Sequence, residues 1–408
     1  MEGARKPGKE LAPMRSPIHV LGVRATTDGM VKEATDVRTP HVDQKVEVAV
    51  LETNPIGHRM HYVRYLVDAV GPEGCIVLTS GRVTDSEEFT EHLSSAVDIT
   101  VALPEVDTPR AALGAAVSKA RAAGARALIV PDGDFYLIPL LLLLLRHPRL
   151  PLEVRLLIMR TTTINGPERL RPATLVKPLL AQLVRVFRQA RIMFLTDALG
   201  VVRARPGYPG IPAVKDPVQP ESQIAHDRPA WLPRRQPGTP LIGVFGVITP
   251  RKNLPLLVKA MDLCPSAVLV VGGALELGTR EFVDSDEDVR RLIASGRLVI
   301  ADQLFRADEL AAALAHVDLV AVLHDNDAPS AILAQACVGH TPVLVPAGGW
   351  LAQVTESTGV GATTTLTAEG VAEAIQRVTR DRRRYVEATR VHASRINTVD
   401  FVEKLLGR

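Results

Sequence analysis

The sequence has little cysteine and little excess charge, and each shortage excludes a class of protein. Its only cysteines are Cys75, Cys264 and Cys337, an odd number at wide spacing. They fit neither a disulfide framework nor a zinc site, so a reducing cytoplasm is the expected location. The formal net charge is +3 over 408 residues, and this balance gives no reason to expect binding to nucleic acid.

Long hydrophobic runs are also absent. The longest candidate for a membrane span, residues 135–145, is eleven residues long, whereas a helix needs roughly 20 to cross a bilayer. We expect this run to form a buried helix. The first 45 residues hold no apolar core of a leader peptide, and we expect residues 1–44 to form a flexible tail.

Short apolar segments alternate with helical patterns from Lys45 onward. In the first half, the expected strands are 47–52, 75–80, 99–103, 127–131, 154–159 and 192–196. In the second half they are 241–246, 267–273, 298–301, 319–324 and 342–346. Apolar strands that alternate with helices of this kind predict parallel sheets with helices on both faces. The predicted fold class is therefore α/β, with two Rossmann-like, doubly wound parallel-sheet domains.

A proline-rich segment separates the two halves. Residues 216–240 carry six prolines and few apolar side chains, so neither a helix nor a central strand is expected there. We predict a first domain at 45–216, a linker at 217–240, a second domain at 241–380 and terminal helices at 381–408. Ligands of such sheets bind at the carboxyl ends of the strands, which predicts a cleft between the domains.

The segment 324–349 carries the clearest functional pattern. It combines a strand end, a loop, a helix that is expected to begin at Pro329 and Ser330, and a second strand. The unpaired amides and the positive dipole end of such a helix attract an anion. Asp327 stands before the helix and Gln335 lies within it, so the two side chains are expected to bind hydroxyl groups on either side of a diphosphate.

This pattern resembles the donor-sugar signature of the family-4 retaining glycosyltransferases, which have the GT-B fold. The matching residues are Asp327, Ser330-Ala331-Ile332-Leu333, Gln335, Gly339, Pro342-Val343 and Gly348-Gly349. The family has Glu where this chain has Asp327 and Gln335. The resemblance implies that the amides from Ser330 to Leu333 bind a donor diphosphate, Gln335 the ribose and Asp327 the sugar. It also implies that the last helices cross back to the first domain.

The loop after the first strand of the second half is the other donor-site candidate. It contains Gly246, Val247, Arg251, Lys252 and Asn253. The family places an Arg beside the Gly and a Lys five residues later, and both contact the diphosphate; Lys252 matches this Lys, whereas Val247 replaces the Arg and Arg251 is adjacent. Asn253 is expected to cap the next helix and Lys252 to face the cleft. The alternative is that Arg251 and Lys252 are solvated loop charges.

Four residues of the first half are candidates for the acceptor side. Gly57 and His58 follow the first strand in a loop that resembles the glycine loop of the family, and a packed or capping histidine is the alternative. Asp132 and Asp134 follow the fourth strand and are candidates for binding acceptor hydroxyls. Helix capping is the alternative explanation for these two carboxylates.

Basic residues without acidic neighbours occur in residues 169–191. Lys177, Arg185, Arg188 and Arg191 fall within an arc of about 120° if the segment is helical. The segment predicts either peripheral contact with an anionic membrane, as in lipid-modifying members of the family, or an ordinary solvated basic face.

The resemblance implies a glycosyltransferase that moves a hexose from a nucleotide diphosphate sugar to a hydroxyl acceptor with retention. The expected catalytic residues are Lys252, Asp327 and His58. The nucleotide sugar is a substrate, so no cofactor is expected, and an ammonium group with a helix N-terminus can stabilise the leaving diphosphate without a metal. Two alternatives stay open. One is a non-catalytic GT-B module with a degenerate donor site, acting as an assembly partner or regulator, and the other is an epimerase that needs no acceptor.

Overall fold

The structure is a computed structural model that describes most of the chain. The described residues are 46–55, 59–93, 99–103, 108–159, 172–201, 208–218, 227–324 and 330–408. The expected tail at 1–44 and the site candidates Gly57, His58 and Asp327 lie outside these ranges. No helix within them is long and apolar enough to cross a membrane.

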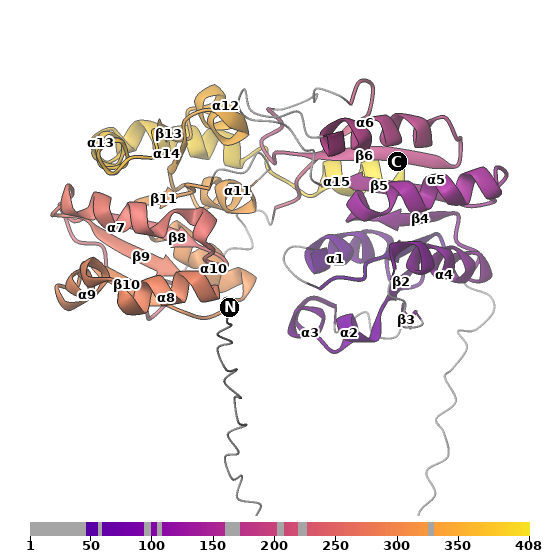
Figure 1. Cartoon of the computed structure of the whole chain (residues 1–408), viewed down its shortest axis with the longest axis horizontal. Helices are drawn as coiled ribbons and strands as arrows, with labels where there is room; N and C mark the ends of the chain where they lie inside the picture. Colours follow the sequence, from indigo (N-terminus) through magenta and orange to yellow (C-terminus); the bar gives the residue numbers. More distant parts are fainter. Residues whose placement is uncertain are drawn as a thin grey trace, which may run out of the picture. The chain divides into compact units, whose positions relative to one another are not determined.

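In the first half, the described strands form a seven-stranded parallel sheet in the order β3-β2-β1-β4-β5-β6-β7 (Figure 1). Its strands are β1 (Val48–Leu51), β2 (Cys75–Thr79), β3 (Thr100–Ala102), β4 (Ala127–Val130), β5 (Glu153–Ile158), β6 (Ala190–Thr196) and β7 (Ala213–Lys215). Every residue of β1 and β4 is buried, as expected for apolar runs covered on both faces of a parallel sheet. The chain proceeds outward from β1 to β3 and then from β4 to β7 on the other side. The strand order therefore reverses between β1 and β4, a switch point where ligands of such sheets bind.

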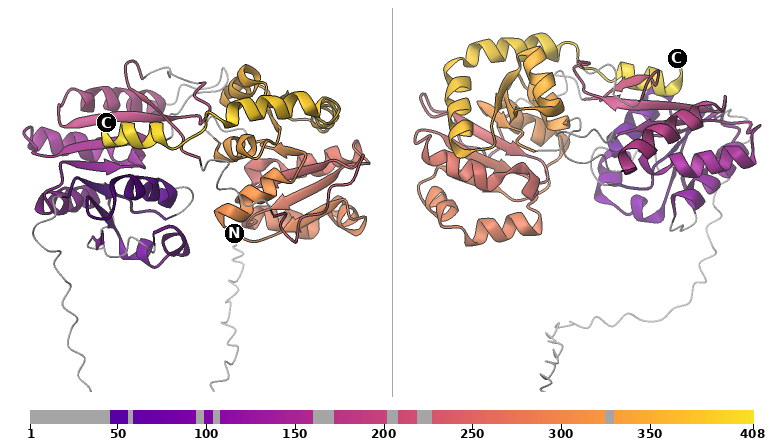
Figure 2. Two further views of the ribbon diagram at one scale, coloured as in Figure 1. Left: turned by 180° about the vertical axis from the view of Figure 1, so that it is seen from behind. Right: turned by 45° about the horizontal axis from the view of Figure 1, so that its top comes forward.

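Helices cover both faces of this sheet. One face packs against α4 (Pro109–Ala122), α5 (Leu137–Arg146) and α6 (Pro172–Arg185). The other packs against α1 (Arg59–Val70), the short α2 (Gly81–Thr84), α3 (Glu87–Leu93) and, from the far end of the sequence, α15 (Val399–Leu406). Figure 2 shows α15, in yellow, beside the strands of the first sheet, and α15 contacts β7 and α1.

The described strands of the second half form a six-stranded parallel sheet in the order β10-β9-β8-β11-β12-β13. Its strands are β8 (Leu241–Phe245), β9 (Val268–Gly272), β10 (Leu298–Ala301), β11 (Leu319–Ala321), β12 (Val343–Pro346) and β13 (Gly361–Thr364). Its helices are α7 (Leu254–Asp262), α8 (Leu277–Ser285), α9 (Glu287–Ala294), α10 (Ala307–Ala315), α11 (Ala331–Val338), α12 (Gly349–Thr358), α13 (Ala368–Arg380) and α14 (Arg382–Ala393). The order reverses between β8 and β11, which gives this sheet its own switch point. The predicted α/β class with two doubly wound parallel sheets is confirmed.

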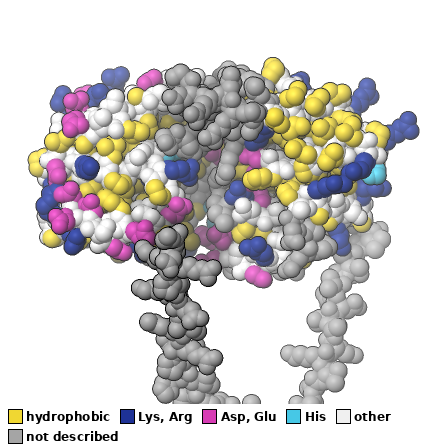
Figure 3. Space-filling model, viewed as in Figure 1, with side chains coloured by type: hydrophobic (Ala, Val, Ile, Leu, Met, Phe, Trp, Pro, Cys, Tyr) yellow, Lys and Arg dark blue, Asp and Glu magenta, His cyan; other side chains and the backbone are white. Residues whose placement is uncertain are grey.

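Two predictions about the first half are wrong. Helix α6 ends at Arg185, and Arg191 belongs to β6, so the basic residues of 169–191 do not share one helical arc. The Leu-rich run begins as a short 3-10 helix, η2 (Gly133–Phe135), and continues as α5. This run is only partly buried, and Ile138 and Leu145 are exposed. Hydrophobic side chains gather on the surface of this region (Figure 3).

Candidate functional site

The loop after β8 meets the first turn of α11 at the switch point of the second sheet. Gly246 has a φ of +80°, and its N–H donates to the carbonyl of Gly272. A Cβ atom added at Gly246 would lie 3.3 Å from Nζ of Lys252 and 3.5 Å from Cδ1 of Ile332. Since both side chains border the same glycine, the structure brings together Gly246, Lys252 and Ile332, as the site prediction requires.

Lys252 belongs to a short 3-10 helix, η4 (Pro250–Lys252), and its ammonium group donates to the carbonyl of Phe245. Burial lowers the pKa of Lys252 to about 8, and the charge of Arg251 adds to this effect. Arg251 itself is exposed. The solvated-charge alternative therefore fits Arg251 and is wrong for Lys252, whose half-buried cation lacks a carboxylate partner among the described residues.

Asn253 does not cap α7 with its side chain, contrary to the prediction. It adopts a left-handed backbone with a φ of 54°, and its side-chain amide donates to the carbonyl of Leu323 at 2.6 Å. Leu323 follows β11, the partner of β8 at the switch point. The side chain of Asn253 therefore links the start of α7 to the segment after β11.

The N-terminus of α11 offers fewer free amides than expected. The helix begins at Ala331, with Ser330 as its cap, and the Ser330 hydroxyl accepts from the amide of Leu333 at 3.3 Å. The Leu333 amide is thus already used, and its side chain is buried in the core. Within the part of the chain that the structure describes, the amides of Ala331 and Ile332 have no acceptor, which leaves these two for an anion.

Gln335 has an unsatisfied oxygen. Its Oε1 atom is buried and has no hydrogen-bond partner among the described residues. Buried polar atoms of this kind are rare and usually mark a water or ligand position. The observation agrees with a hydroxyl-binding role for Gln335, which stays a prediction.

At the switch point of the first sheet, Asp132 forms an ion pair with Arg59. Its Oδ2 atom accepts from Arg59 at 2.7 Å, and both side chains are largely buried. Asp132 makes no helix-capping bond, so the capping alternative is wrong for it. Asp134 accepts from the amide of Met159 at 3.1 Å and from Lys177 at 2.8 Å, and so links η2 to β5 and α6. Both carboxylates therefore have structural partners, and acceptor binding by them stays a prediction.

Glu52 was missed by the sequence reasoning. It follows β1 directly, is 4% exposed, and uses Oε1 to accept from the amide of Asn54 at 2.9 Å. Its Oε2 atom is buried without a partner in the described residues. Burial raises the pKa of Glu52 to about 8, and the nearby Asp132 adds to the rise while Arg59 opposes it. The carboxyl group is therefore mostly protonated at neutral pH. An acidic residue immediately after a fully apolar strand was the available signal.

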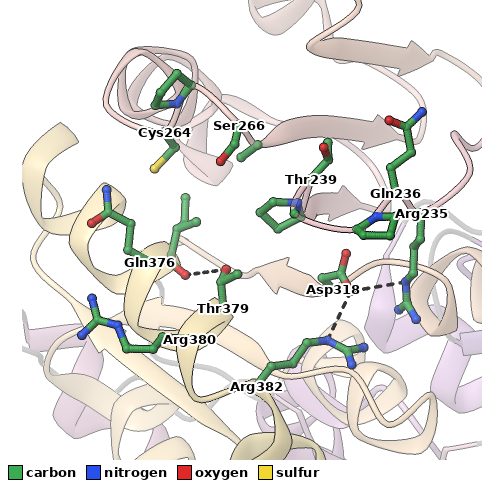
Figure 4. A pocket seen from close by; sticks show the side chains of 16 residues that line it. Arg235, Gln236, Thr239, Cys264, Ser266, Asp318, Gln376, Thr379, Arg380 and Arg382 are labelled. Atoms are coloured by element: carbon green, nitrogen blue, oxygen red, sulfur yellow. Dashed lines mark hydrogen bonds and ion pairs between the residues drawn. The ribbon is translucent and has the colours of Figure 1, made fainter.

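A cavity of about 770 Å³ lies at the opposite edge of the second sheet, where β8 and β11 begin (Figure 4). Asp318 forms ion pairs with Arg235 at 3.4 Å and Arg382 at 3.2 Å, and it accepts from the amide of Leu241. These bonds tie the segment before β8 to the start of α14. Because ligands of parallel sheets bind at the carboxyl ends of the strands, we assign this cluster a structural role.

No protein-family model and no curated protein sequence matches this chain. Solved structures do match this chain. HepE of Anabaena, in complex with UDP and glucose, matches with a TM-score of 0.62 and 14% identity, over 89% of this chain and 98% of that one. Sucrose-phosphate synthase of Thermosynechococcus elongatus matches with a TM-score of 0.63 and 14% identity, over 88% and 96%. A glycosyltransferase of Rickettsia africae matches with a TM-score of 0.64 and 11% identity, over 89% and 97%.

Proposed function

We propose that this chain, whose two sheets form the GT-B fold, is a glycosyltransferase that uses a nucleotide diphosphate sugar. It transfers a hexose to a hydroxyl acceptor with retention. The observation that carries the proposal is the meeting of Lys252, Gly246 and Ile332 at the switch point of the second sheet. A cation, a glycine without a side chain and free helix amides are what a diphosphate needs from a protein.

In the proposed mechanism, Lys252 and the amides of Ala331 and Ile332 neutralise the diphosphate as it leaves the sugar. The ammonium then exchanges the Phe245 carbonyl for phosphate oxygens, which are stronger acceptors because they are charged. Breaking the sugar–phosphate bond concentrates negative charge on the leaving group, so contacts that strengthen at this step lower the barrier. The proposal includes no metal ion, since the lysine and the helix supply the positive charge.

Three further residues complete the proposed donor site. The buried Oε1 of Gln335 accepts a hydrogen bond from a ribose hydroxyl and thereby gains the partner that it lacks. Asp327 binds sugar hydroxyls, and Arg251 is an exposed second cation beside Lys252. On the acceptor side, the proposal keeps Gly57 and His58 together with Asp132 and Asp134, which lie after β4 at the carboxyl edge of the first sheet.

A donor screen tests the proposal. UDP-hexoses come first, because HepE was solved with UDP and with UDP-glucose, and other nucleotide sugars follow. Wild type, Lys252→Ala and Lys259→Ala are assayed for hydrolysis and transfer; Lys259 is an exposed lysine on the neighbouring helix α7 and serves as the control. We expect Lys252→Ala to lower turnover at least about tenfold, which is about 1.4 kcal/mol of barrier, and Lys259→Ala to leave it unchanged.

The non-catalytic alternative predicts a different result. Val247, Asp327 and Gln335 depart from the family pattern, and a decayed pocket would bind none of the nucleotide sugars in a calorimetric titration. Binding followed by conversion of the donor to an isomeric nucleotide sugar, with neither hydrolysis nor an acceptor, would instead identify an epimerase. Equal turnover of wild type and Lys252→Ala would remove Lys252 from the mechanism.

A further inference from the structure

Exposed hydrophobic side chains of the first half gather on one surface. In the described part of residues 46–218, every large hydrophobic residue that is exposed lies on η2, α5 or α6 or just after α6. These residues, which we name the α5–α6 surface, are Phe135, Ile138, Leu145, Val176, Leu179, Leu183 and Val186. Figure 3 shows hydrophobic side chains gathered in this region. Single exposed apolar residues are ordinary, but a contiguous group marks an interaction site.

The helices explain why these side chains form one surface. On α5, Leu140 and Leu144 face the core, while Ile138 and Leu145 lie two turns apart on the outer side. On α6, the exposed residues follow a helical stripe whose members are Val176, Leu179 and Leu183. Since α5 packs against α6, the two outer stripes adjoin. A helix that is apolar on its outer side as well as its inner side is suited to burial on both sides.

A basic cavity borders this surface at the C-terminal end of α5. The cavity has a volume of about 1060 Å³, and its ionisable lining residues are Arg121, Arg146, His147 and Arg149, without a carboxylate. No ion pair of the three arginines occurs within the described ranges. Arg146 follows Leu145 directly on α5, so the apolar surface and the basic cavity share a border.

We propose that the α5–α6 surface docks on an anionic lipid bilayer, with lipid phosphates in the basic cavity and the exposed leucines in the acyl region. A bilayer offers a layer of negative charge directly above hydrocarbon, and this matches arginines that border apolar side chains. A symmetric contact between two copies fits less well, because it would bring two cavities of the same charge toward each other. The inference does not depend on the proposed activity.

This surface differs from the basic helical arc expected from the sequence. Lys177 is paired with Asp134, and Arg191 is paired with Glu153. The exposed apolar side chains of α6 lie on this surface, and the cations that line the cavity come from α4, the end of α5 and the residues just after it. The structure therefore moves the docking charge from residues 169–191 to the cavity at Arg146 and Arg149.

Vesicle co-sedimentation without any nucleotide sugar tests the inference. The full chain is mixed with vesicles of phosphatidylcholine alone, or with an equimolar mixture of phosphatidylcholine and phosphatidylglycerol. We expect binding only to the anionic vesicles, and weaker binding at high salt. The double variants Leu145→Ser/Leu179→Ser and Arg146→Glu/Arg149→Glu should each lower the vesicle partition coefficient at least about tenfold. Leu277→Ser, at an exposed leucine of α8, should bind like wild type.

Thermal melting of each variant checks that the fold is retained, which is expected because the changed side chains are exposed. Wild type that fails to bind anionic vesicles, or double variants that bind as well as it does, would overturn the inference. So would a dimer in light scattering that the leucine variant abolishes, since the surface would then join two copies. Full displacement from vesicles by millimolar inorganic phosphate at constant ionic strength would also contradict it, because the cavity would then be a site for soluble anions.

Discussion

The side-chain amide of Asn253 donates a 2.6 Å hydrogen bond to the carbonyl of Leu323. The bond connects the residue before α7 to the segment just after β11, the strand that pairs with β8 where the second sheet reverses its order. The bond therefore helps to hold Asn253, and with it the adjacent Lys252, beside the end of β11. A residue that the sequence predicted to be a side-chain helix cap instead links two segments beside the candidate donor site.

Substitution of Asn253 should separate its two roles. Asn253→Gly keeps the left-handed backbone and loses the bond to Leu323, so we expect a loss of about 1 kcal/mol in the free energy of unfolding. Asn253→Ala adds the penalty of a Cβ atom in a left-handed backbone, roughly 1–2 kcal/mol more. Urea denaturation of both variants checks the order. If Asn253→Ala is as stable as Asn253→Gly, the residue is not left-handed in solution.

Donor affinity should depend on pH through Lys252. The pKa of Lys252 is lowered to about 8 in the free protein, and a bound diphosphate raises it again. Below pH 8 the ammonium is charged with or without the donor, so the affinity stays level. Above pH 8, binding must restore a proton, and the affinity falls by up to about tenfold per pH unit. Calorimetric titration of the nucleotide found in the donor screen measures this.

Lys252→Arg is the control for the pH experiment. A guanidinium stays charged throughout this range, so the affinity of the variant should show no decrease between pH 8 and pH 9. A matching decrease in wild type and variant would assign the titration to another group.

Stability should fall with rising pH because of Glu52. Its pKa rises from 4.5 to about 8 on folding, so between these values the folded protein holds a proton that the unfolded chain has lost. The stabilisation is complete below pH 4.5 and is lost as pH rises through 8. Glu52→Gln removes the contribution of Glu52 to this pH dependence. Relative to wild type, the free energy of unfolding of the variant should therefore rise by on the order of a few kcal/mol between pH 5 and pH 8.

Chemical denaturation at several pH values in this range measures how steeply the free energy of unfolding of Glu52→Gln changes with pH. Burial raises the pKa of Asp216 to about 7. In the Glu52→Gln variant, the free energy of unfolding therefore still decreases with rising pH, but less steeply than in wild type. Glu373→Gln, at an exposed carboxylate of α13, is the control and should leave the wild-type slope unchanged. An unaltered slope in Glu52→Gln would show that Glu52 is ionised in the folded protein.

Gly246→Ala should damage the donor site more than the fold. The new Cβ atom would lie 3.3 Å from Nζ of Lys252, and the left-handed φ adds a strain of roughly 1–2 kcal/mol. Gly238 has a similar φ of +79° with no atom within 4 Å of its added Cβ, so Gly238→Ala measures the strain alone. We expect both variants to lose similar stability and only Gly246→Ala to lose donor affinity, measured by titration. Equal affinities would place the diphosphate away from Gly246.

The fold class was predictable because strands buried on both faces leave unbroken apolar runs, such as Leu241–Phe245 in β8. The meeting of Gly246, Lys252 and Ile332 was predictable too, since the loops after parallel strands gather at one edge of the sheet, whereas donor binding there stays a prediction. Helices α8 and α9 were not predicted. Their sequence is rich in charge and they bury few side chains, among them Thr279, Val289 and Leu292, so few apolar residues mark them as helices.

Side-chain partners across the sequence were beyond prediction. Arg59 pairs with Asp132, 73 residues away, and Glu52 forms no ion pair with a cation among the described residues. Nothing local to Glu52 encodes that outcome. The exposure of one side of α5 could not be predicted either, because a run of leucines has the same sequence pattern whether one or both sides of its helix are covered.

Helix α15 has a consequence for how the protein is made. Phe401 is fully buried and packs on Tyr62 of α1, with ring centroids 4.8 Å apart, and Leu405 is buried beside it. The ribosome completes every strand of the first sheet before it begins the second, and it reaches α15 only after both. Throughout that interval, the apolar side chains that α15 covers in the finished protein lack this cover, and exposed apolar surface of this kind favours aggregation of the nascent chain.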